Sequence, residues 1–332
     1  MLPERFTEPA GFQWGAFSDS GGANIRYGYL QPDGQAKGTI VIAPGFREPI
    51  EKCFEVTREM AARGFSVWIM DWHGQGGSDR FLPDNPQKMH SLGYGEHIET
   101  LHQFTSQIVR KPAGPLVFIG HSMGAHIGLR YLKEHEGVFD SAILDSTMFD
   151  VLTPGMPKGL ARQLVRFAKA GNYLGKYIPG GGDWSDAENI FPGHNTTSDR
   201  ERFSVLGEIF AAKPALKMGQ PTYGWVLHTF ESIDILNDES YLKSIKTPVL
   251  MGIAGADTIV DKTAEERACR MLPNCTRVDI PDAKHEIWME RDELRAPWLA
   301  RVSVFLEDRL NKHGLMPKKP RQHSAPRPPK MG

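Results

Sequence analysis

The sequence predicts an α/β fold with a mainly parallel sheet and one large insertion. Residues 38–43 (GTIVIA) and 65–70 (FSVWIM) are short, continuously apolar runs, which are typical of strands buried on both faces of a parallel sheet. Segments with helical spacing, such as 51–63, alternate with these runs along the chain. Strands that alternate with helices indicate βαβ units with right-handed crossovers.

Further elements follow in the same rhythm. Residues 24–30 (NIRYGYL) alternate polar with apolar side chains, as a half-buried strand does. The helix expected over 51–63 stops at Gly64, a usual residue at a helix end. The remaining strands are expected at 116–119, 142–144, 248–253 and 276–280, and the remaining helices at 93–110, 123–135 and 297–312.

One block interrupts the alternation. Residues 146–238 contain helical patterns and a glycine-rich stretch but no clear strand, so we expect an inserted helical lid. The core is then formed by 1–145 and 239–312. Residues 313–332 are rich in proline and basic residues, lack acidic ones and are expected to be disordered.

Composition excludes several other classes of protein. The 332 residues are 40% hydrophobic with a net charge of −1, which suits a globular protein and gives no reason to expect a nucleic-acid partner. No window is apolar enough to span a bilayer, and the first residues lack a signal-peptide pattern. Three cysteines imply no disulfide framework and favour a reducing, cytoplasmic compartment.

The strongest chemical motif is GHSMG at 120–124, a G-x-S-x-G between an expected strand and helix. Serine in such a tight turn is held above the sheet, and the glycines let backbone segments approach closely. The start of the following helix favours a developing negative charge. Ser122 is therefore the candidate nucleophile.

A serine hydroxyl needs a base, and the base needs an orienting carboxylate. His285 lies between the last expected strand and the final helix, where open α/β sheets place active-site loops. Asp257 follows the strand at 248–253 and completes the chain order Ser, Asp, His. Asp145 is a rival acid, because it ends the strand after the nucleophile helix.

Stabilisation of the oxyanion requires two backbone N–H donors. The Met123 amide directly follows the nucleophile. The second donor should come from Pro44-Gly45-Phe46, the loop after the strand at 38–43, where we expect the Phe46 amide.

Several segments carry a resemblance to a known superfamily. They are APGFREPIEKC, GFSVWIMDWHGQGGSDR, GHSMGAH, TSDRERF, QPTYGWV, GADTIVD and AKHEIWMERDE, in order and spread over about 39–310. The chain resembles the α/β-hydrolase superfamily, in its branch of bacterial lysophospholipases and monoacylglycerol lipases. The resemblance implies a Ser122–His285–Asp257 triad, with Phe46 and Met123 in the oxyanion hole. Many relatives carry His-Gly where this chain has Pro44-Gly45, which favours the lysophospholipase side.

The expected activity is hydrolysis of carboxylic esters of single-chain lipids through an acyl-enzyme, without metal or organic cofactor. An aminopeptidase, thioesterase or acyltransferase on the same triad, or a non-catalytic binding protein, is the alternative. The basic tail suggests weak contact with anionic membranes, while a solubilising role is the simpler explanation. Arg200, Arg202 and Lys213 are candidate phosphate contacts, although a solvated helix face also explains them. An apolar wall for an acyl chain could come from several lid residues, although most of them are expected to form the lid's own core: Met148, Phe149, Leu152, Met156, Trp184, Phe191, Phe210, Tyr223 and Trp225.

Overall fold

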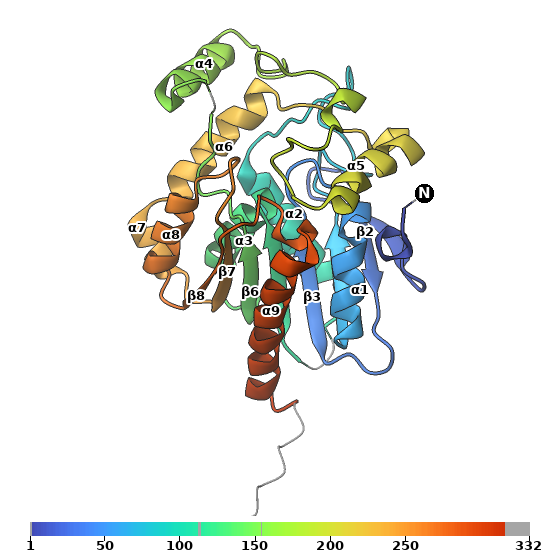
Figure 1. Cartoon of the computed structure of the whole chain (residues 1–332). Helices are drawn as coiled ribbons and strands as arrows, with labels where there is room; N and C mark the ends of the chain where they lie inside the picture. Colours follow the sequence, from blue (N-terminus) through green and yellow to red (C-terminus); the bar gives the residue numbers. More distant parts are fainter. Residues whose placement is uncertain (1, 112–113, 154, 316–332) are drawn as a thin grey trace, which may run out of the picture.

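The computed structural model describes residues 2–111, 114–153 and 155–315, and its centre is an eight-stranded sheet (Figure 1). The strand order is β1-β2-β4-β3-β5-β6-β7-β8, with β1, β2 and β4 joined antiparallel and all other neighbours parallel. The predicted α/β class with a mainly parallel sheet is therefore confirmed. The strands are β1 (Gln13–Ser18), β2 (Asn24–Leu30), β3 (Gly38–Ala43), β4 (Phe65–Met70), β5 (Leu116–His121), β6 (Ser141–Asp145), β7 (Val249–Ala254) and β8 (Cys275–Ile280).

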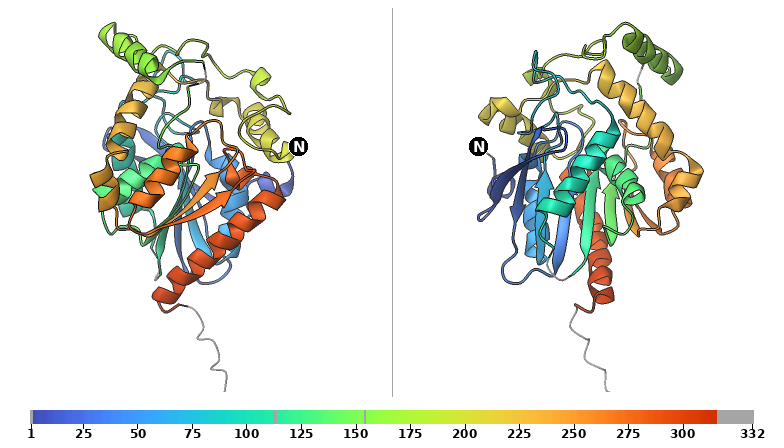
Figure 2. Two further views of the ribbon diagram at one scale, coloured as in Figure 1. Left: turned by 60° about the vertical axis from the view of Figure 1, so that its left-hand side comes forward. Right: turned by 180° about the vertical axis from the view of Figure 1, so that it is seen from behind.

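Helices cover both faces of this sheet, which is why its central strands are apolar throughout. The helices are α1 (Phe54–Ala62), α2 (Tyr94–Gln103), α3 (Met123–Glu134), α4 (Lys158–Ala170), α5 (Arg200–Ala212), α6 (Tyr223–Leu236), α7 (Glu239–Ser244), α8 (Lys262–Met271) and α9 (Asp292–Lys312). Helices α1 and α9 pack on one face, and α2, α3 and α8 on the other (Figure 2). Every residue of β3, β4, β6 and β7 is buried.

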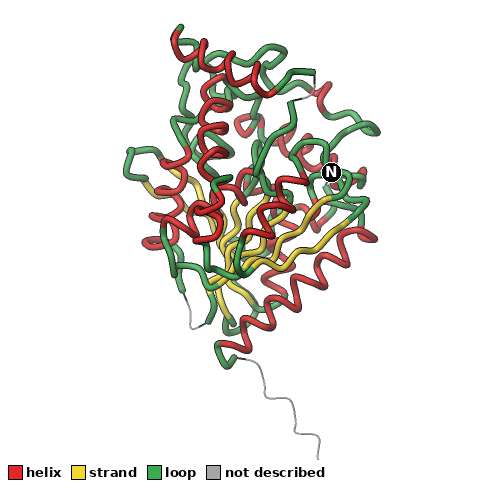
Figure 3. Tube along the Cα trace, turned by 90° about the vertical axis from the view of Figure 1, so that its left-hand side faces the viewer, coloured by secondary structure: helices red, strands yellow, loops and turns green. Residues whose placement is uncertain are grey.

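The described part of residues 146–238 lies largely beyond the carboxyl ends of the parallel strands, where helices and loops rise above the yellow strands (Figure 3). Helix α4 is the outermost of these helices in Figure 1, whereas Arg202 of α5 pairs with Glu55 of α1 and Asp292 of α9. Among the described residues of this block there is no strand, only helices and isolated β-bridges. Helix α6 belongs to both regions, because it packs on α4 as well as on α2, α3 and α7. The exact division into core and lid stays a prediction, and most of the predicted tail lies outside the described residues.

The observed elements differ from the sequence predictions in one additional strand and in several boundaries. Strand β1 was not predicted, because at an exposed edge its residues lack a clean alternation of burial. Helix α9 begins at Asp292, five residues before the predicted start at Pro297. Pro297 therefore lies inside the helix, in its second turn, where it lacks the N–H for one backbone hydrogen bond of the helix.

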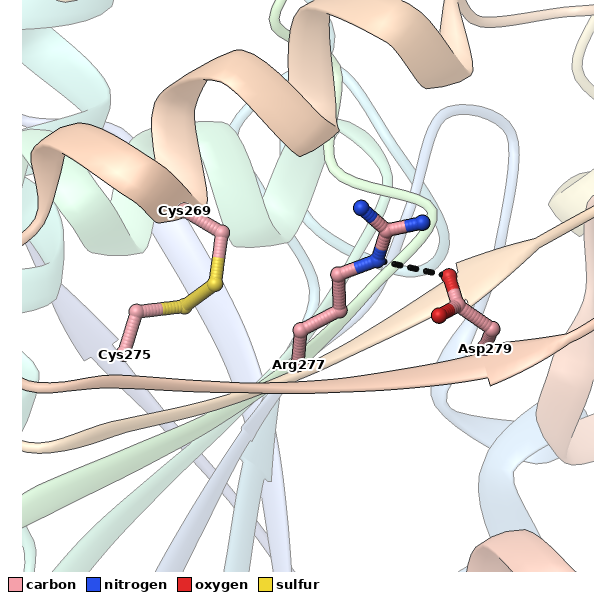
Figure 4. The surroundings of a disulfide bond; sticks show 4 residues. All are labelled: Cys269, Cys275, Arg277 and Asp279. Atoms are coloured by element: carbon pink, nitrogen blue, oxygen red, sulfur yellow. Dashed lines mark hydrogen bonds and ion pairs between the residues drawn. A yellow bond between two sulfur atoms is a disulfide. The ribbon is translucent and has the colours of Figure 1, made fainter.

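The expectation that the cysteines form no disulfide is wrong. Cys269, near the end of α8, is bonded to Cys275, the first residue of β8, while Cys53 is free (Figure 4). The turn between α8 and β8 brings the two Cα atoms within 5.5 Å, a proximity that cysteine spacing alone does not reveal. The cysteine count therefore no longer argues for a reducing compartment. In the described part of the chain, no helix has the length and apolarity needed to cross a bilayer.

Candidate active site

Ser122 lies in a tight turn between β5 and α3, with the strained backbone angles φ 50° and ψ −114°. The flanking glycines make this turn possible. A Cβ atom at Gly120 would lie 2.7 Å from the Ala125 Cα atom, and one at Gly124 only 2.2 Å from the Ala43 carbonyl oxygen. Since real Cβ atoms do not approach this closely, only glycine fits. The turn presents a serine that is 6% exposed.

The structure brings Ser122, His285 and Asp257 into one hydrogen-bonded chain. His285 Nε2 lies 3.0 Å from Ser122 Oγ, and His285 Nδ1 lies 2.7 Å from Asp257 Oδ2. The other Asp257 oxygen accepts hydrogen bonds from the Ile259 and Val260 amides. Burial opposes ionisation of Asp257, but the bonds to His285 and to these amides lower its pKa. An ionised carboxylate therefore faces Nδ1 and fixes the tautomer whose Nε2 accepts the serine proton.

The rival acid, Asp145, has other partners. It contacts His121 Nδ1 at 2.9 Å and accepts a hydrogen bond from Trp288 Nε1 at 2.7 Å. Burial disfavours the charged imidazole of His121, but Asp145 and Glu48 raise its pKa to about 9. His121 is thus a buried cation whose ring lies 4.9 Å, centre to centre, from that of His285.

The two predicted oxyanion donors lie at neighbouring strand ends. Strands β3 and β5 pair with Ala43 opposite Gly120, so the loop after β3 meets the turn at Ser122. Among the described residues, neither the Phe46 amide nor the Met123 amide donates a hydrogen bond to a protein acceptor. Both amides are therefore available to a developing negative charge.

Ser122 and His285 open into a cavity of about 440 Å³. Its volume falls in the range of small-molecule binding sites. The apolar lining comes from loops that follow the strands and from the block 146–238. It consists of Phe46, Met148, Val151, Trp184, Phe203, Leu206, Trp225, Ile259 and Val260. The polar lining consists of Arg47, Glu48, Lys52, His121, Glu188, Asn189, His194, Asn195, Thr196, Gln220 and Glu286. The cavity therefore offers both an apolar and a strongly polar wall.

A buried ion triad forms part of the polar wall. Lys52 Nζ lies 2.6 Å from Glu48 Oε1 and 2.7 Å from Glu286 Oε1, and all three side chains are at most 10% exposed. Burial would raise the pKa of Glu48, but Lys52 and His121 lower it to about 2. Because Glu48 follows Phe46 closely and Glu286 follows His285, Lys52 joins the loop of the oxyanion donor to the loop of the base.

Only part of the predicted acyl wall lines the cavity. Met148, Trp184 and Trp225 do, whereas Phe149 and Phe210 are fully buried in the packed interior and Leu152 is 40% exposed. Sequence patterns could not separate these cases, because a residue that packs the interior of a lid is as apolar as one that lines its cavity. The sequence did not predict that Ile259 and Val260 line the cavity, although they closely follow Asp257, the proposed acid of the triad.

The proposed phosphate contacts lie elsewhere. Arg202 is buried against Glu55 and Asp292, and Lys213 pairs with Glu51. Neither lines the cavity, and neither does Arg200. Besides His121, the cations in the described lining of the cavity are Arg47 and Lys52, which lie in or near the predicted oxyanion loop but were not predicted to contact a ligand.

One cluster has side chains of the metal-binding type. Ligand atoms of Asp19, His73 and Glu96 lie within 4.8 Å of one another, outside the cavity lining. His73 Nδ1 contacts Glu96 at 2.6 Å, and Asp19 accepts hydrogen bonds from the Gly21 and Ala23 amides. These hydrogen bonds within the chain are enough to explain why the three side chains lie close together.

Comparison with known proteins agrees with this fold. The fold is shared with solved α/β-hydrolases, among them a soluble variant of monoglyceride lipase from Saccharomyces cerevisiae in complex with a substrate analog (TM-score 0.69, 18% identity, covering 91% of this chain and 96% of that one). A thermostable carboxyl esterase from Bacillus coagulans gives the same TM-score of 0.69 at 15% identity, covering 90% and 99%. The chain therefore has the α/β-hydrolase fold.

The family is shown by sequence. Residues 34–292 match the family described as "Serine aminopeptidase, S33" (Hydrolase_4), and the chain belongs to it. Lysophospholipase L2 of Escherichia coli K12 is 30% identical over 286 residues, 82% of this chain and 80% of that protein. Monoacylglycerol lipase of Mycolicibacterium smegmatis is 26% identical over 166 residues, 50% of this chain and 54% of that protein. The resemblance seen in the sequence segments is confirmed.

Proposed function

We propose that the chain is a serine hydrolase that cleaves carboxylic esters of single-chain lipids, with Ser122, His285 and Asp257 as its triad. The observation that carries the proposal is the continuous hydrogen-bonded chain of these three residues, which ends in a cavity beside two unpaired amides. The named relatives, a lysophospholipase and a monoacylglycerol lipase, support the substrate class.

The geometry supports a two-step reaction. Ser122 Oγ attacks the ester carbonyl carbon as its proton moves to His285 Nε2, and the carbonyl oxygen becomes an oxyanion held by the Phe46 and Met123 amides. The C–O bond to the leaving alcohol then breaks, and that oxygen takes the proton from Nε2. Water then attacks the acyl carbon and gives a proton to Nε2; the bond from that carbon to Ser122 Oγ breaks, Oγ takes the proton from Nε2, and the fatty acid leaves.

The two kinds of cavity wall suit a substrate with one acyl chain and a polar head. Met148, Val151 and Trp225 offer an apolar surface for the chain. On the polar wall, Arg47 has a buried Nη2 with no acceptor among the described residues, although its Nη1 pairs with Glu188. A phosphate oxygen would supply such an acceptor. Together with Pro44-Gly45 before Phe46, this favours lysophospholipids over monoacylglycerols.

The family description makes an aminopeptidase the second candidate. Binding of a free α-amine requires an unpaired acid in the cavity. The acids of the lining are Glu48, Glu188 and Glu286, and each forms an ion pair, with Lys52 or Arg47. The polar wall therefore lacks a free carboxylate for an ammonium group, within the described residues, and this observation favours esters.

A substrate panel tests the proposal. Wild type and Ser122→Ala are compared on a lysophospholipid, a monoacylglycerol of equal acyl chain, and an aminoacyl-naphthylamide. We expect Ser122-dependent hydrolysis of the first two, faster on the lysophospholipid. Turnover of the naphthylamide alone would replace the esterase assignment by a peptidase, and turnover unaffected in folded Ser122→Ala would remove Ser122 from the mechanism.

Membrane contact through the basic tail and a cytoplasmic location remain predictions. Five basic residues in 315–332 would contribute about 1 kcal/mol each near an anionic surface. Co-sedimentation with phosphatidylserine vesicles, before and after deletion of 315–332, measures this contribution. Equal binding by both forms would show that the tail is not the contact.

A further inference from the structure

In the turn that follows β3, side chains bond to four backbone groups, one of which is the Pro44 carbonyl. The Gly45 amide donates to Glu48 Oε2 at 2.6 Å, and the Arg47 amide donates to Gln75 Oε1 at 2.7 Å. The Gly45 carbonyl accepts from Gln75 Nε2 at 3.1 Å. Between these two paired amides, only that of Phe46 has no acceptor among the described residues.

We propose that Gln75 is a positioning residue that sets the oxyanion hole, by holding the peptide groups on both sides of Phe46 so that the Phe46 amide alone faces the cavity. The inference rests on the proposed function. A single amide side chain can do this because it carries an acceptor and a donor on one rigid plane. Gln75 uses both, one on each side of the donor residue.

Gln75 is itself held in place. The residue is 2% exposed, and its backbone N–H donates to the Trp72 carbonyl at 2.9 Å. The next residue, Gly76, has φ 51° and packs so closely that a Cβ atom would lie 2.1 Å from the Asp71 carboxylate. Trp72 Nε1 in turn donates to the Pro44 carbonyl at 2.8 Å. The loop after β4 is therefore a fixed support for the loop after β3.

The backbone at Arg47 shows why such a support is needed. Arg47 has φ 62°, a conformation that side chains other than glycine rarely adopt. Such strain persists only where surrounding contacts over-determine the backbone. The bond from the Arg47 amide to Gln75 is the contact that holds this peptide, and without it the turn can relax and rotate the Phe46 amide away from the oxyanion.

Gln75→Met tests the proposal, because methionine matches glutamine in length but forms neither bond. Loss of one whole oxyanion donor lowers kcat by about 10²–10³. We therefore expect kcat of Gln75→Met on a soluble p-nitrophenyl ester to fall by roughly 10- to 100-fold, with KM within about twofold. Gln75→Glu keeps the acceptor for the Arg47 amide and should fall between this variant and wild type.

A second readout separates positioning from general damage. An alkyl boronic acid forms a tetrahedral adduct on Ser122 that needs the oxyanion donors, whereas the product fatty acid forms no such adduct and depends on them less. We expect boronate affinity to fall in parallel with kcat/KM, and inhibition by fatty acid to change much less. Gln35→Met, at an exposed glutamine far from the cavity lining, is the matched control and should behave as wild type.

The outcomes are distinguishable. Active-site titration with a fluorophosphonate counts competent enzyme, so a lower rate that only reflects fewer folded molecules overturns the inference. An unchanged kcat, or equal loss of boronate and fatty-acid binding, also overturns it. If Gln75→Met does not fold, Gln75→Glu decides by the same readouts. Absence of Ser122-dependent ester hydrolysis in wild type would instead overturn the proposed function, and this inference with it.

Discussion

The buried ion triad around Lys52 makes a quantitative prediction about stability. Replacement of Lys52 by methionine keeps the length of the side chain but leaves Glu48 and Glu286 as neighbouring buried carboxylates. Removal of one partner from a buried ion pair lowers the free energy of unfolding by about 3–5 kcal/mol. The fall of the Glu48 pKa from 4.5 to about 2 corresponds to roughly 3 kcal/mol, which agrees with the lower part of that range.

The pH dependence identifies the cause. In wild type the depressed pKa of Glu48 contributes stability that is present above pH 4.5 and is lost as the pH falls toward about 2. In Lys52→Met the largest influence on Glu48, burial, is opposed only by His121 and the Gly45 amide, so we expect the pKa of Glu48 to rise from its wild-type value. The carboxyl then takes up a proton as the pH is lowered from 7, so the stability deficit of the variant should shrink toward about pH 4.5.

Urea unfolding of wild type and Lys52→Met, followed by tryptophan fluorescence at several pH values from 4.5 to 8, measures the deficit. Lys243→Met is the matched control, because Lys243 pairs with Glu239 on the exposed surface of α7, where an ion pair contributes at most about 0.5 kcal/mol. A deficit of the same size at all pH values, or one no larger than in Lys243→Met, would refute the electrostatic explanation.

Three further predictions follow from the site. Because the pKa of His121 is raised from 6.5 to about 9, its contribution to stability is complete below pH 6.5 and disappears as the pH rises through 9. In urea unfolding, the free energy of unfolding of His121→Gln should therefore decline less between pH 6.5 and 9 than that of wild type. Asp257→Asn should lower kcat by about 10⁴ in a folded enzyme, whereas Asp145→Asn should keep most of kcat and lose about 1.5–3 kcal/mol of stability; equal kinetic defects would contradict these separate roles. Because Cys269 and Cys275 close a short loop, their joint replacement by alanine should lower stability by about 2 kcal/mol and abolish any effect of dithiothreitol on unfolding.

The fold was largely predictable because its signals are local. Continuous apolar runs such as 38–43 and 65–70 are buried on both faces of the parallel sheet, and Gly64 follows the end of α1 as predicted. Strand β1 was not predicted because an exposed edge strand needs no apolar pattern. The disulfide was not predicted for a different reason, since its two cysteines are six residues apart and meet only through the turn between α8 and β8.

The residues of the candidate site also fall into a predicted and an unpredicted group. Ser122, His285 and Asp257 were predicted from their places after strands, and the structure places them within hydrogen-bonding distance. The supports of the site were not predicted. Gln75 is one polar residue among many in a glycine-rich loop, and its two bonds become apparent only when β3 and β4 lie side by side. Polar residues that act through backbone groups leave no spacing rule in the sequence.

The central claim, that Ser122 is a nucleophile activated by His285, is tested most directly by fluorophosphonate labelling with the adduct mapped by peptide mass spectrometry. Wild type, Ser122→Ala and His285→Ala are labelled in parallel, with folding checked by circular dichroism. We predict one adduct at Ser122 in wild type, none in Ser122→Ala and strongly slowed labelling in His285→Ala. An adduct at another residue, or labelling of Ser122 at an unchanged rate in folded His285→Ala, would contradict the claim.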